Sequence, residues 1–193
     1  MSLFQKDYST KPDEELMSLL TKGGQQAFDE LYKRYSKPLL NFFFRMLNND
    51  RTKAEDMLHD LFLKIIEKPE SFDHTRTFST WFYTLAGNMI RNEYRSYQIR
   101  NEYMQQSRNQ SNEWVEFNEE NIDRLSFDHQ LQAELEHLGP EAKIMFNLRF
   151  VEEMSVKQIA EITDCPEGTV KSRLFYITRQ LAKKLSVYKS VLN

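Results

Sequence analysis

Basic and hydroxyl side chains cluster near the C-terminal end of the chain, in the segment 167-EGTVKSRLFYITR-179. Lysine, arginine and short hydroxyl side chains contact DNA phosphates, and arginine can also bind guanine edges in the major groove. From Gly168 to the C-terminus the sequence holds six bases and no acid. This pattern favours a surface that binds nucleic acid.

The residues before this segment predict the first helix of a helix-turn-helix. Ser155 and Gln158 fit a capping box, and the small Ala160 would let a crossing helix approach closely. A break at 164–168 separates this helix from a second one, whose first turns would enter the major groove. The side chains then free to contact DNA are Thr169, Lys171, Ser172, Arg173, Tyr176 and Arg179. An ordinary helical hairpin with a solvated basic face is the alternative.

An acidic face is predicted on an amphipathic helix over 53-KAEDMLHDLFLKIIEK-68. Its apolar face comprises Leu58, Leu61, Phe62, Ile65 and Ile66, and its polar face comprises Glu55, Asp56, His59 and Asp60. Such a face could bind a basic helical surface of a partner. The opposite charges would then guide the approach of the two surfaces and fix how they align. The alternative is that acids near a helix N-terminus simply stabilise the helix dipole, which suits Glu55 and Asp56 better than Asp60.

A further helix is predicted over 79–100, after a loop at 70–78, and it carries both aromatic and basic residues. Trp81, Leu85 and Met89 would be buried, with Arg91 and Arg95 outside. Single-stranded DNA binds aromatic side chains flanked by positive charge, so this helix is a second candidate for nucleic acid. The alternative is that Phe78 and Trp81 belong to the core, which is the plainer interpretation for Trp81.

The composition and the helical patterns along the chain predict an all-α protein of two small helical domains, at 11–100 and 128–190, because the periodicity lapses between them. Only 5 Gly and 5 Pro occur among 193 residues, and the abundant Leu, Lys, Glu and Gln favour helices. Helices are also expected over 13–22 and around Pro38, where the proline would interrupt or restart the helix.

The domains are expected to be joined by a flexible acidic linker at 101–127. Residues 102–136 hold nine acids and two bases, so their net charge is −7 and that of the remaining chain is +4, within a total of −3. The low total therefore does not exclude a nucleic-acid binder.

Several classes of function lack support in the sequence. There is one cysteine, Cys165, so no internal disulfide can form, and no apolar run reaches membrane-spanning length. The four histidines and Cys165 show no metal-ligand spacing, and no nucleotide-binding loop or catalytic arrangement stands out. We therefore expect a cytoplasmic protein without catalytic residues, metal, cofactor, membrane insertion or small-molecule substrate.

Three segments together resemble bacterial RNA polymerase sigma factors of the sigma-70 family, in the extracytoplasmic-function (ECF) group. Residues 141–181, which include 167-EGTVKSRL-174, resemble the promoter-binding domain of that group. The run 54-AEDMLHDLFLK-64 resembles its polymerase-binding helix, and 78-FSTWFYTLAGN-88 resembles its promoter-melting segment. Two independent halves in family order cover nearly the whole chain.

The resemblance implies partners and a role for each segment. Residues 11–100 would bind the beta-prime clamp helices of core RNA polymerase and the minus-ten element, while residues 128–190 would bind the minus-thirty-five element of promoter DNA. The beta flap would be a further polymerase contact, and an anti-sigma factor is a further candidate partner. Polymerase contacts would come from Glu55, Asp56, His59, Asp60 and Phe62.

Minus-ten contacts would come from Asp73, His74, Thr75, Arg76, Phe78, Trp81, Asn88, Arg91 and Arg95. The resemblance adds Glu167 and Gly168 to the six candidates already named for the minus-thirty-five element. The chain departs from the family pattern at three positions: Gly87 replaces a frequent Arg, Asn92 a frequent Asp and Glu153 a frequent Gly. A self-sufficient helix-turn-helix regulator remains the main alternative, and a helical interaction protein that never touches DNA is a more distant one.

Overall fold

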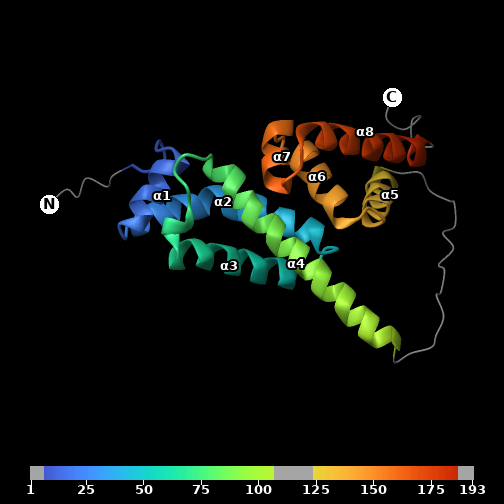
Figure 1. The fold of residues 1–193 in the computed structure, drawn as a ribbon, viewed down its shortest axis with the longest axis horizontal. Helices are drawn as coiled ribbons and strands as arrows, with labels where there is room; N and C mark the ends of the chain where they lie inside the picture. The colour runs from blue at the N-terminus through green and yellow to red at the C-terminus, as the bar shows by residue number, and fades with distance from the viewer. Residues whose placement is uncertain (1–6, 107–123, 187–193) are drawn as a thin grey trace.

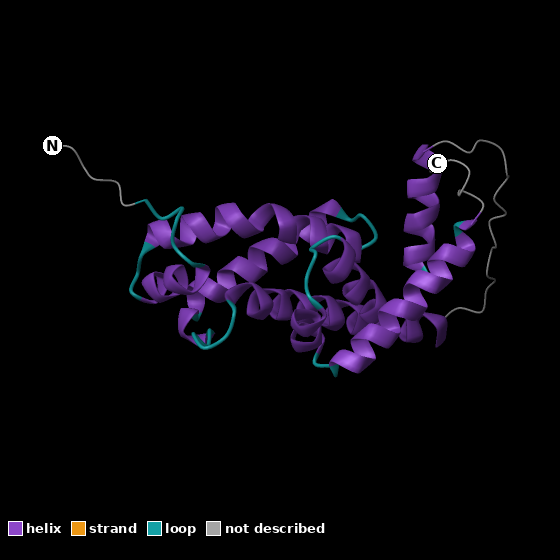
Figure 2. Cartoon of the chain, turned by 90° about the horizontal axis from the view of Figure 1, so that it is seen from above, coloured by secondary structure: helices purple, strands orange, loops and turns teal. Residues whose placement is uncertain are grey.

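The protein is described by a computed structural model, which places residues 7–106 and 124–186. Every regular element in these two ranges is helical, and the helices are joined by short loops (Figure 2). The predicted all-α class is therefore confirmed. We refer to residues 7–106 as the N-terminal unit and to residues 124–186 as the C-terminal unit.

The N-terminal unit is built from α1 (Asp13–Thr21), α2 (Gln25–Met46), α3 (Arg51–Glu67), a 3-10 turn (Pro69–Ser71) and α4 (Phe78–Gln106). The expected end of α1 is confirmed, because Gly23 has a φ of 81°, a left-handed conformation that glycine adopts without strain. Helix α3 begins after Asp50, whose side chain accepts a hydrogen bond from the backbone N–H of Lys53 at 3.0 Å.

Pro38 does not break its helix, contrary to expectation. Helix α2 continues from Gln25 to Met46 with the proline inside it. Leu31 before the proline and Leu39 and Phe42 after it are all fully buried. Tertiary packing of one continuous apolar face thus outweighs the backbone hydrogen bond that proline cannot make.

The C-terminal unit is built from α5 (Arg124–Glu136), α6 (Pro140–Phe150), α7 (Val156–Thr163) and α8 (Glu167–Lys184). Helix α4 continues to Gln106, past the expected start of the linker at 101, and α5 begins four residues before the expected domain start at 128. Residues 107–123 of the expected linker lie outside the described residues.

The two units pack against each other and share one hydrophobic core. Helix α7 packs against α4, and α6 contacts both α4 and α2 (Figure 1). The shared cluster includes Phe82 and Ile90 of α4 together with Ile159 and Ile162 of α7, all of them buried. The helix-turn-helix is therefore held directly on the helix that carries the second nucleic-acid candidate.

None of the helices in the described ranges combines the length and the apolar character needed to cross a membrane.

Candidate functional site

The predicted capping box sets the start of α7. The Ser155 side chain accepts a hydrogen bond from the backbone N–H of Gln158 at 3.2 Å, and the Gln158 side chain accepts one from the backbone N–H of Ser155 at 3.0 Å. Ile159 and Ile162 are buried on the inner face of this helix. Two otherwise unpaired helix donors are satisfied, so the first turn of α7 is well defined.

The turn between α7 and α8 fixes how the second helix leaves the first. Asp164 ends α7 with a left-handed φ of 51°, and Pro166 is the N-cap of α8 in extended backbone. Val170, Leu174 and Ile177 then point into the core. The predicted helix-turn-helix is present, with α8 starting at Glu167.

The opposite face of α8 is exposed and basic. Lys171, Ser172 and Arg173 are all exposed, and Lys171 makes a loose ion pair with Glu167 at 3.9 Å. The predicted contact residues of α8 that lie on the open surface are Glu167, Gly168, Lys171, Ser172, Arg173, Tyr176 and Arg179, while Thr169 is half-buried at the helix start. This face can meet phosphates and base edges without rearrangement of the unit.

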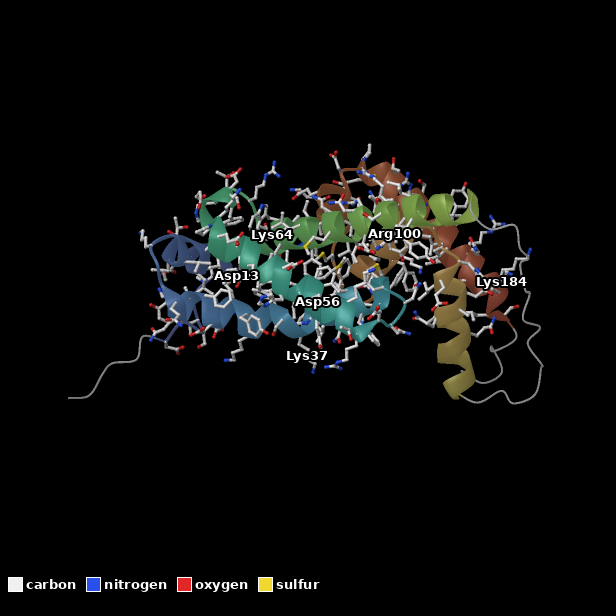
Figure 3. The ribbon with its side chains drawn as sticks, turned by 90° about the horizontal axis from the view of Figure 1, so that it is seen from below. Asp13, Lys37, Asp56, Lys64, Arg100 and Lys184 are labelled. Carbon is white, nitrogen blue, oxygen red and sulfur yellow. The ribbon has the colours of Figure 1, made fainter. Side chains whose placement is uncertain are left out.

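The acidic face of α3 is exposed as well. Glu55, Asp56, His59 and Asp60 all lie on the surface, and Figure 3 shows Asp56 on the outside of α3. Glu55 is paired with Arg51 at 2.8 Å within the same helix. Asp56 and Asp60, four residues apart, therefore present two carboxylates on one side of the helix, away from the basic face of α8.

An apolar groove of about 580 Å³ lies beside this acidic face, between α2 and α3. Its lining includes Phe62, Leu63 and Ile66 together with Glu55 and His59. Ile66, which was expected on the apolar face of the helix, is 46% exposed and lines the groove. Phe62 is only 3% exposed and packs against Tyr32 with tilted rings at a centroid distance of 4.8 Å, so it forms the floor of the groove.

The loop before α4 is open to solvent and internally ordered. Asp73, His74, Thr75 and Arg76 are all exposed. The Asp73 carboxylate accepts hydrogen bonds from the backbone N–H of Thr75 at 2.9 Å and from its hydroxyl at 2.7 Å. These two bonds, the backbone one first, lower the pKa of Asp73, so it stays charged. The loop therefore presents a fixed set of polar groups to a ligand.

The aromatic residues at the start of α4 form a packed cluster. Phe78 is fully buried, with Trp81 at 5.8 Å and Phe82 at 5.1 Å between ring centroids. Direct contact of Phe78 with a base is thus not available in this structure, because its ring is core. Trp81 is half-buried and rests on Phe72 at 5.1 Å, which agrees with its plainer interpretation.

The polar residues of α4 fall into two groups. Asn88 and Arg95 are exposed, whereas Arg91 is held by the C-terminal unit. The Arg91 Nε donates to Glu141 at 2.7 Å, and its Nη1 donates to the Asn88 side chain at 2.7 Å. The sequence predicted Arg91 on the outside. Its pairing with Glu141, 50 residues away, had no signal in the local pattern.

The described residues include no group of three His, Cys, Asp or Glu side chains arranged to hold a metal ion. The single thiol, of Cys165, is half-buried in the turn of the helix-turn-helix, 3.9 Å from Nη1 of Arg173. The described residues thus form three candidate surfaces: one acidic and grooved on α3, one polar on the loop and α4, and one basic on α8.

Two family models match the chain. The model described as Sigma-70 region 2 matches residues 31–99, and the model described as Sigma-70, region 4 matches residues 128–176. The first spans α3, the loop and most of α4, and the second spans the helix-turn-helix. Both halves of the chain are thus matched, each with its own candidate surface.

Curated relatives and solved structures agree with these matches. ECF RNA polymerase sigma factor SigW of Bacillus subtilis is 28% identical over 85% of this chain and 91% of its own. The ECF RNA polymerase sigma-E factor of Haemophilus influenzae is 29% identical over 90% of this chain and 95% of its own.

Among solved structures, CnrH in complex with the cytosolic domain of CnrY has a TM-score of 0.68 at 20% identity, covering 91% of this chain and 97% of CnrH. RpoE of Bartonella quintana in complex with the anti-sigma factor NepR has a TM-score of 0.59 at 22% identity, covering 83% of this chain and 97% of that one. These structures share the fold of this chain.

Proposed function

Because the chain belongs to the sigma-70 family of RNA polymerase sigma factors, in its extracytoplasmic-function group, we propose that it binds core RNA polymerase and directs it to specific promoters. The observation that carries the proposal is the separation of two opposite surfaces on one chain. An acidic, grooved face lies on α3, and a basic face lies on α8. A protein that binds a polymerase and DNA at once needs both.

The α3 face is our candidate for the polymerase contact. Asp56 and Asp60 supply exposed charge that would steer a basic helical surface into place. The neighbouring groove offers Leu63 and Ile66, 36% and 46% exposed, as apolar anchors for the same partner helices. Phe62 would act indirectly, by supporting the groove from below.

The loop at 73–76 and the outer side of α4 are our candidate for the minus-ten element. The loop offers carboxylate, imidazole, hydroxyl and guanidinium groups within four residues, which suits the polar edge of an extruded base. Asn88 and Arg95 extend this surface along α4. Phe78 and Trp81 would shape the surface rather than stack on bases.

The exposed face of α8 is our candidate for the minus-thirty-five element. Lys171 and Arg173 would contact phosphates or guanine edges in the major groove, with Ser172 between them. A self-sufficient helix-turn-helix regulator would use the same face but would leave the acidic face and groove of α3 without a role. We therefore favour the polymerase subunit, which contributes binding while the polymerase supplies the chemistry.

An anti-sigma factor is a further candidate partner. The observation that favours it is the fold shared with RpoE, which was solved with the anti-sigma factor NepR.

Retention of the purified chain on core RNA polymerase tests the proposal. We expect the unaltered chain to bind and Asp56→Asn with Asp60→Asn to bind at least tenfold more weakly. Glu67→Gln, an exposed acid at the end of the same helix, is the matched control and should bind normally. Failure of the unaltered chain to bind core polymerase would overturn the proposal.

A further inference from the structure

The backbone N–H group at the start of α4 is bound by a side chain of α1. The N–H of Phe78 donates a hydrogen bond to Glu14 Oε1 at 2.9 Å, although the two residues are 64 positions apart in the chain. The first N–H groups of a helix have no acceptor within the helix, and a side chain just before the helix usually accepts from one of them. Here the acceptor comes from another helix, so Glu14 caps α4 from a distance.

The carboxylate of Glu14 also supplies a charge that α4 lacks. The first turn of α4 contains no acid of its own. A helix N-terminus carries a partial positive charge, so a carboxylate placed there is favourable. Glu14 is half-buried, which limits the access of water to its bond with the Phe78 N–H. A hydrogen bond to a carboxylate is stronger than one between neutral groups, so this contact can hold the start of α4 firmly.

Helix α1 is itself fixed on α2. Leu16 of α1 is fully buried. Asp13 directly precedes Glu14 in the chain. The Asp13 side chain accepts hydrogen bonds from Arg34 Nη1 at 2.6 Å and from the Tyr35 hydroxyl, and both donors belong to α2. Glu14 therefore stands on a rigid element, as a residue that positions others must.

The exposed loop at 73–76, our candidate for the minus-ten element, is flanked by two buried aromatic rings. Phe72 before the loop is 3% exposed, and Phe78 after it is fully buried. Their ring centroids lie 5.5 Å apart. Helix α1 contacts both the 3-10 turn that precedes the loop and the start of α4 that follows it (Figure 1). A displacement of the Phe78 backbone would therefore move the polar groups of the loop.

The hydrogen bonds within the loop set its shape but not its orientation on the molecule. Asp73 accepts from the N–H and the hydroxyl of Thr75, and its carbonyl accepts from the N–H of Arg76 at 2.9 Å. These bonds join residues of the loop only to each other. Burial of the Phe78 ring holds the end of the loop in the core, but apolar packing is non-directional. The bond from Phe78 to Glu14 is directional, so it orients the loop relative to α1.

We propose that Glu14 is a positioning residue for recognition of the minus-ten element. The inference rests on the proposed function and extends it to α1, which lies before the residues 31–99 matched by the region 2 model. Glu14 acts through the backbone of Phe78, so that the polar groups at 73–76 face an extruded base in one orientation. Hydrogen bonds to a base weaken steeply away from ideal geometry, so a small shift of the loop would reduce discrimination between bases.

Amide hydrogen exchange of the free full-length chain, followed by NMR, tests the bond itself. The Phe78 N–H should exchange slowly in the unaltered chain. Glu14→Ala should make this exchange about tenfold faster, as expected for the loss of one hydrogen bond to a charged group, whereas Glu14→Gln keeps an acceptor oxygen and should retain most of the protection. Glu15→Ala is the matched control, because it removes an exposed acid from the same first turn of α1. Equal exchange of the Phe78 N–H in all four proteins would overturn the inference.

Run-off transcription on matched templates tests the role of Glu14 in promoter recognition. The templates are a promoter that core polymerase transcribes with the unaltered chain, and versions of this promoter with single base changes in the minus-ten element. The measured quantity is the ratio of transcript from the original template to transcript from each altered template. A variant that is only less stable lowers both amounts together and leaves this ratio unchanged. The ratio therefore separates positioning of the loop from stability of the fold.

Glu14→Ala should lower this ratio by about fivefold at one or more minus-ten positions, the smaller end of what one good contact to a base contributes to discrimination. Glu14→Gln and Glu15→Ala should keep the ratio of the unaltered chain. An unchanged ratio in Glu14→Ala, or an equal loss in Glu14→Gln, would overturn the inference while leaving the proposed function intact. Absence of transcript with the unaltered chain would instead overturn the proposed function.

Discussion

The hydroxyl of Tyr83 on α4 donates a 2.6 Å hydrogen bond to Glu152, 69 residues later in the chain. This bond joins the helix that carries the proposed melting surface to the loop that precedes the helix-turn-helix. Glu152 also meets Arg45 of α2 at 3.2 Å. One carboxylate thus connects three separate segments of the fold.

Tyr83→Phe should lower the free energy of unfolding at neutral pH. It should also make the decrease of this free energy at alkaline pH shallower. Burial, and then the bond to Glu152, raise the pKa of Tyr83. As the folded pKa lies above the unfolded value of about 10, this stabilisation is complete below pH 10 and is lost as the pH rises further.

We expect the free energy of unfolding at pH 7, measured with urea, to fall by about 1.5–3 kcal/mol through loss of the hydrogen bond to a charged group. Between pH 9 and 11, the free energy of unfolding should decrease less steeply with pH than in the unaltered chain. Some decrease should remain, because burial also raises the pKa of Tyr35. Tyr176→Phe, at a 65% exposed position, should change neither quantity. An unaltered alkaline slope in Tyr83→Phe would contradict this account.

Lys143→Met should raise stability at neutral pH. Burial lowers the pKa of Lys143, so the unfolded chain binds the proton more tightly than the folded chain. The charged lysine therefore opposes folding below its lowered pKa, and this cost fades as the pH rises towards the unfolded value of about 10.4. We expect a gain of about 1 kcal/mol at pH 7 that shrinks by pH 10.

The measurement is urea unfolding at both pH values, with exposed Lys157→Met as the control. A destabilised Lys143→Met protein would show that the contacts of the ammonium with Asn48 and Tyr94 outweigh its burial.

Glu153→Gly should stabilise the chain. Glu153 has a φ of 54°, a left-handed conformation that costs a residue with a Cβ roughly 1–2 kcal/mol. Glycine loses part of this gain through its freedom in the unfolded state, so we expect a net gain of about 0.5–1 kcal/mol by thermal or urea unfolding. Glu153→Ala retains the Cβ and should give no such gain. Equal effects of Gly and Ala would show that the backbone conformation is not the cause.

Lys171→Ala with Arg173→Ala should weaken binding to duplex DNA that contains the minus-thirty-five element. Each lost phosphate contact lowers the slope of log affinity against log salt by about 0.9, so two lost contacts would lower it by roughly 2. Fluorescence anisotropy over a salt series measures both quantities. Lys183→Ala, on the same helix but in its last turn, should bind nearly as the unaltered chain does. A double variant with unchanged affinity and slope would remove α8 from the proposed interface.

The local sequence was enough to predict the helices and the helix-turn-helix. The capping box at Ser155, the buried Val170 and Leu174, and the exposed acids of α3 all follow from periodicity and capping, which act over a few residues. These features depend on neighbours in the chain. They are therefore visible without a tertiary structure.

The errors lie where tertiary packing decides. Pro38 was expected to interrupt α2, but packing on both sides keeps the helix continuous. Ile66 was expected on the apolar face of α3 and lines an open groove. Phe78 was a candidate for DNA contact with core burial as the alternative, and its ring is buried. The periodicity of one helix says which residues share a face. It does not say how wide the partner surface covering that face is.

The polar contacts between the N-terminal and C-terminal units could not be predicted from the sequence at all. Glu141, Lys143 and Glu152 have partners that lie 49 to 107 residues away, so no local pattern indicates them. Glu153 stands where the family pattern frequently has glycine. Its φ of 54° lies in the left-handed region that favours glycine, and this conformation is seen only in the structure. Charge pairing over such separations becomes evident only from the packed structure.

Run-off transcription tests most directly whether the chain directs core RNA polymerase to specific promoters. Core bacterial RNA polymerase would be incubated with genomic DNA fragments, with and without the purified chain, and the transcript starts would be mapped. We expect discrete transcripts that require the chain and share sequence elements near minus ten and minus thirty-five. The amount of transcript should decrease with Asp56→Asn and Asp60→Asn but not with Glu67→Gln. Core polymerase that neither binds the chain nor starts at new sites in its presence would contradict the account.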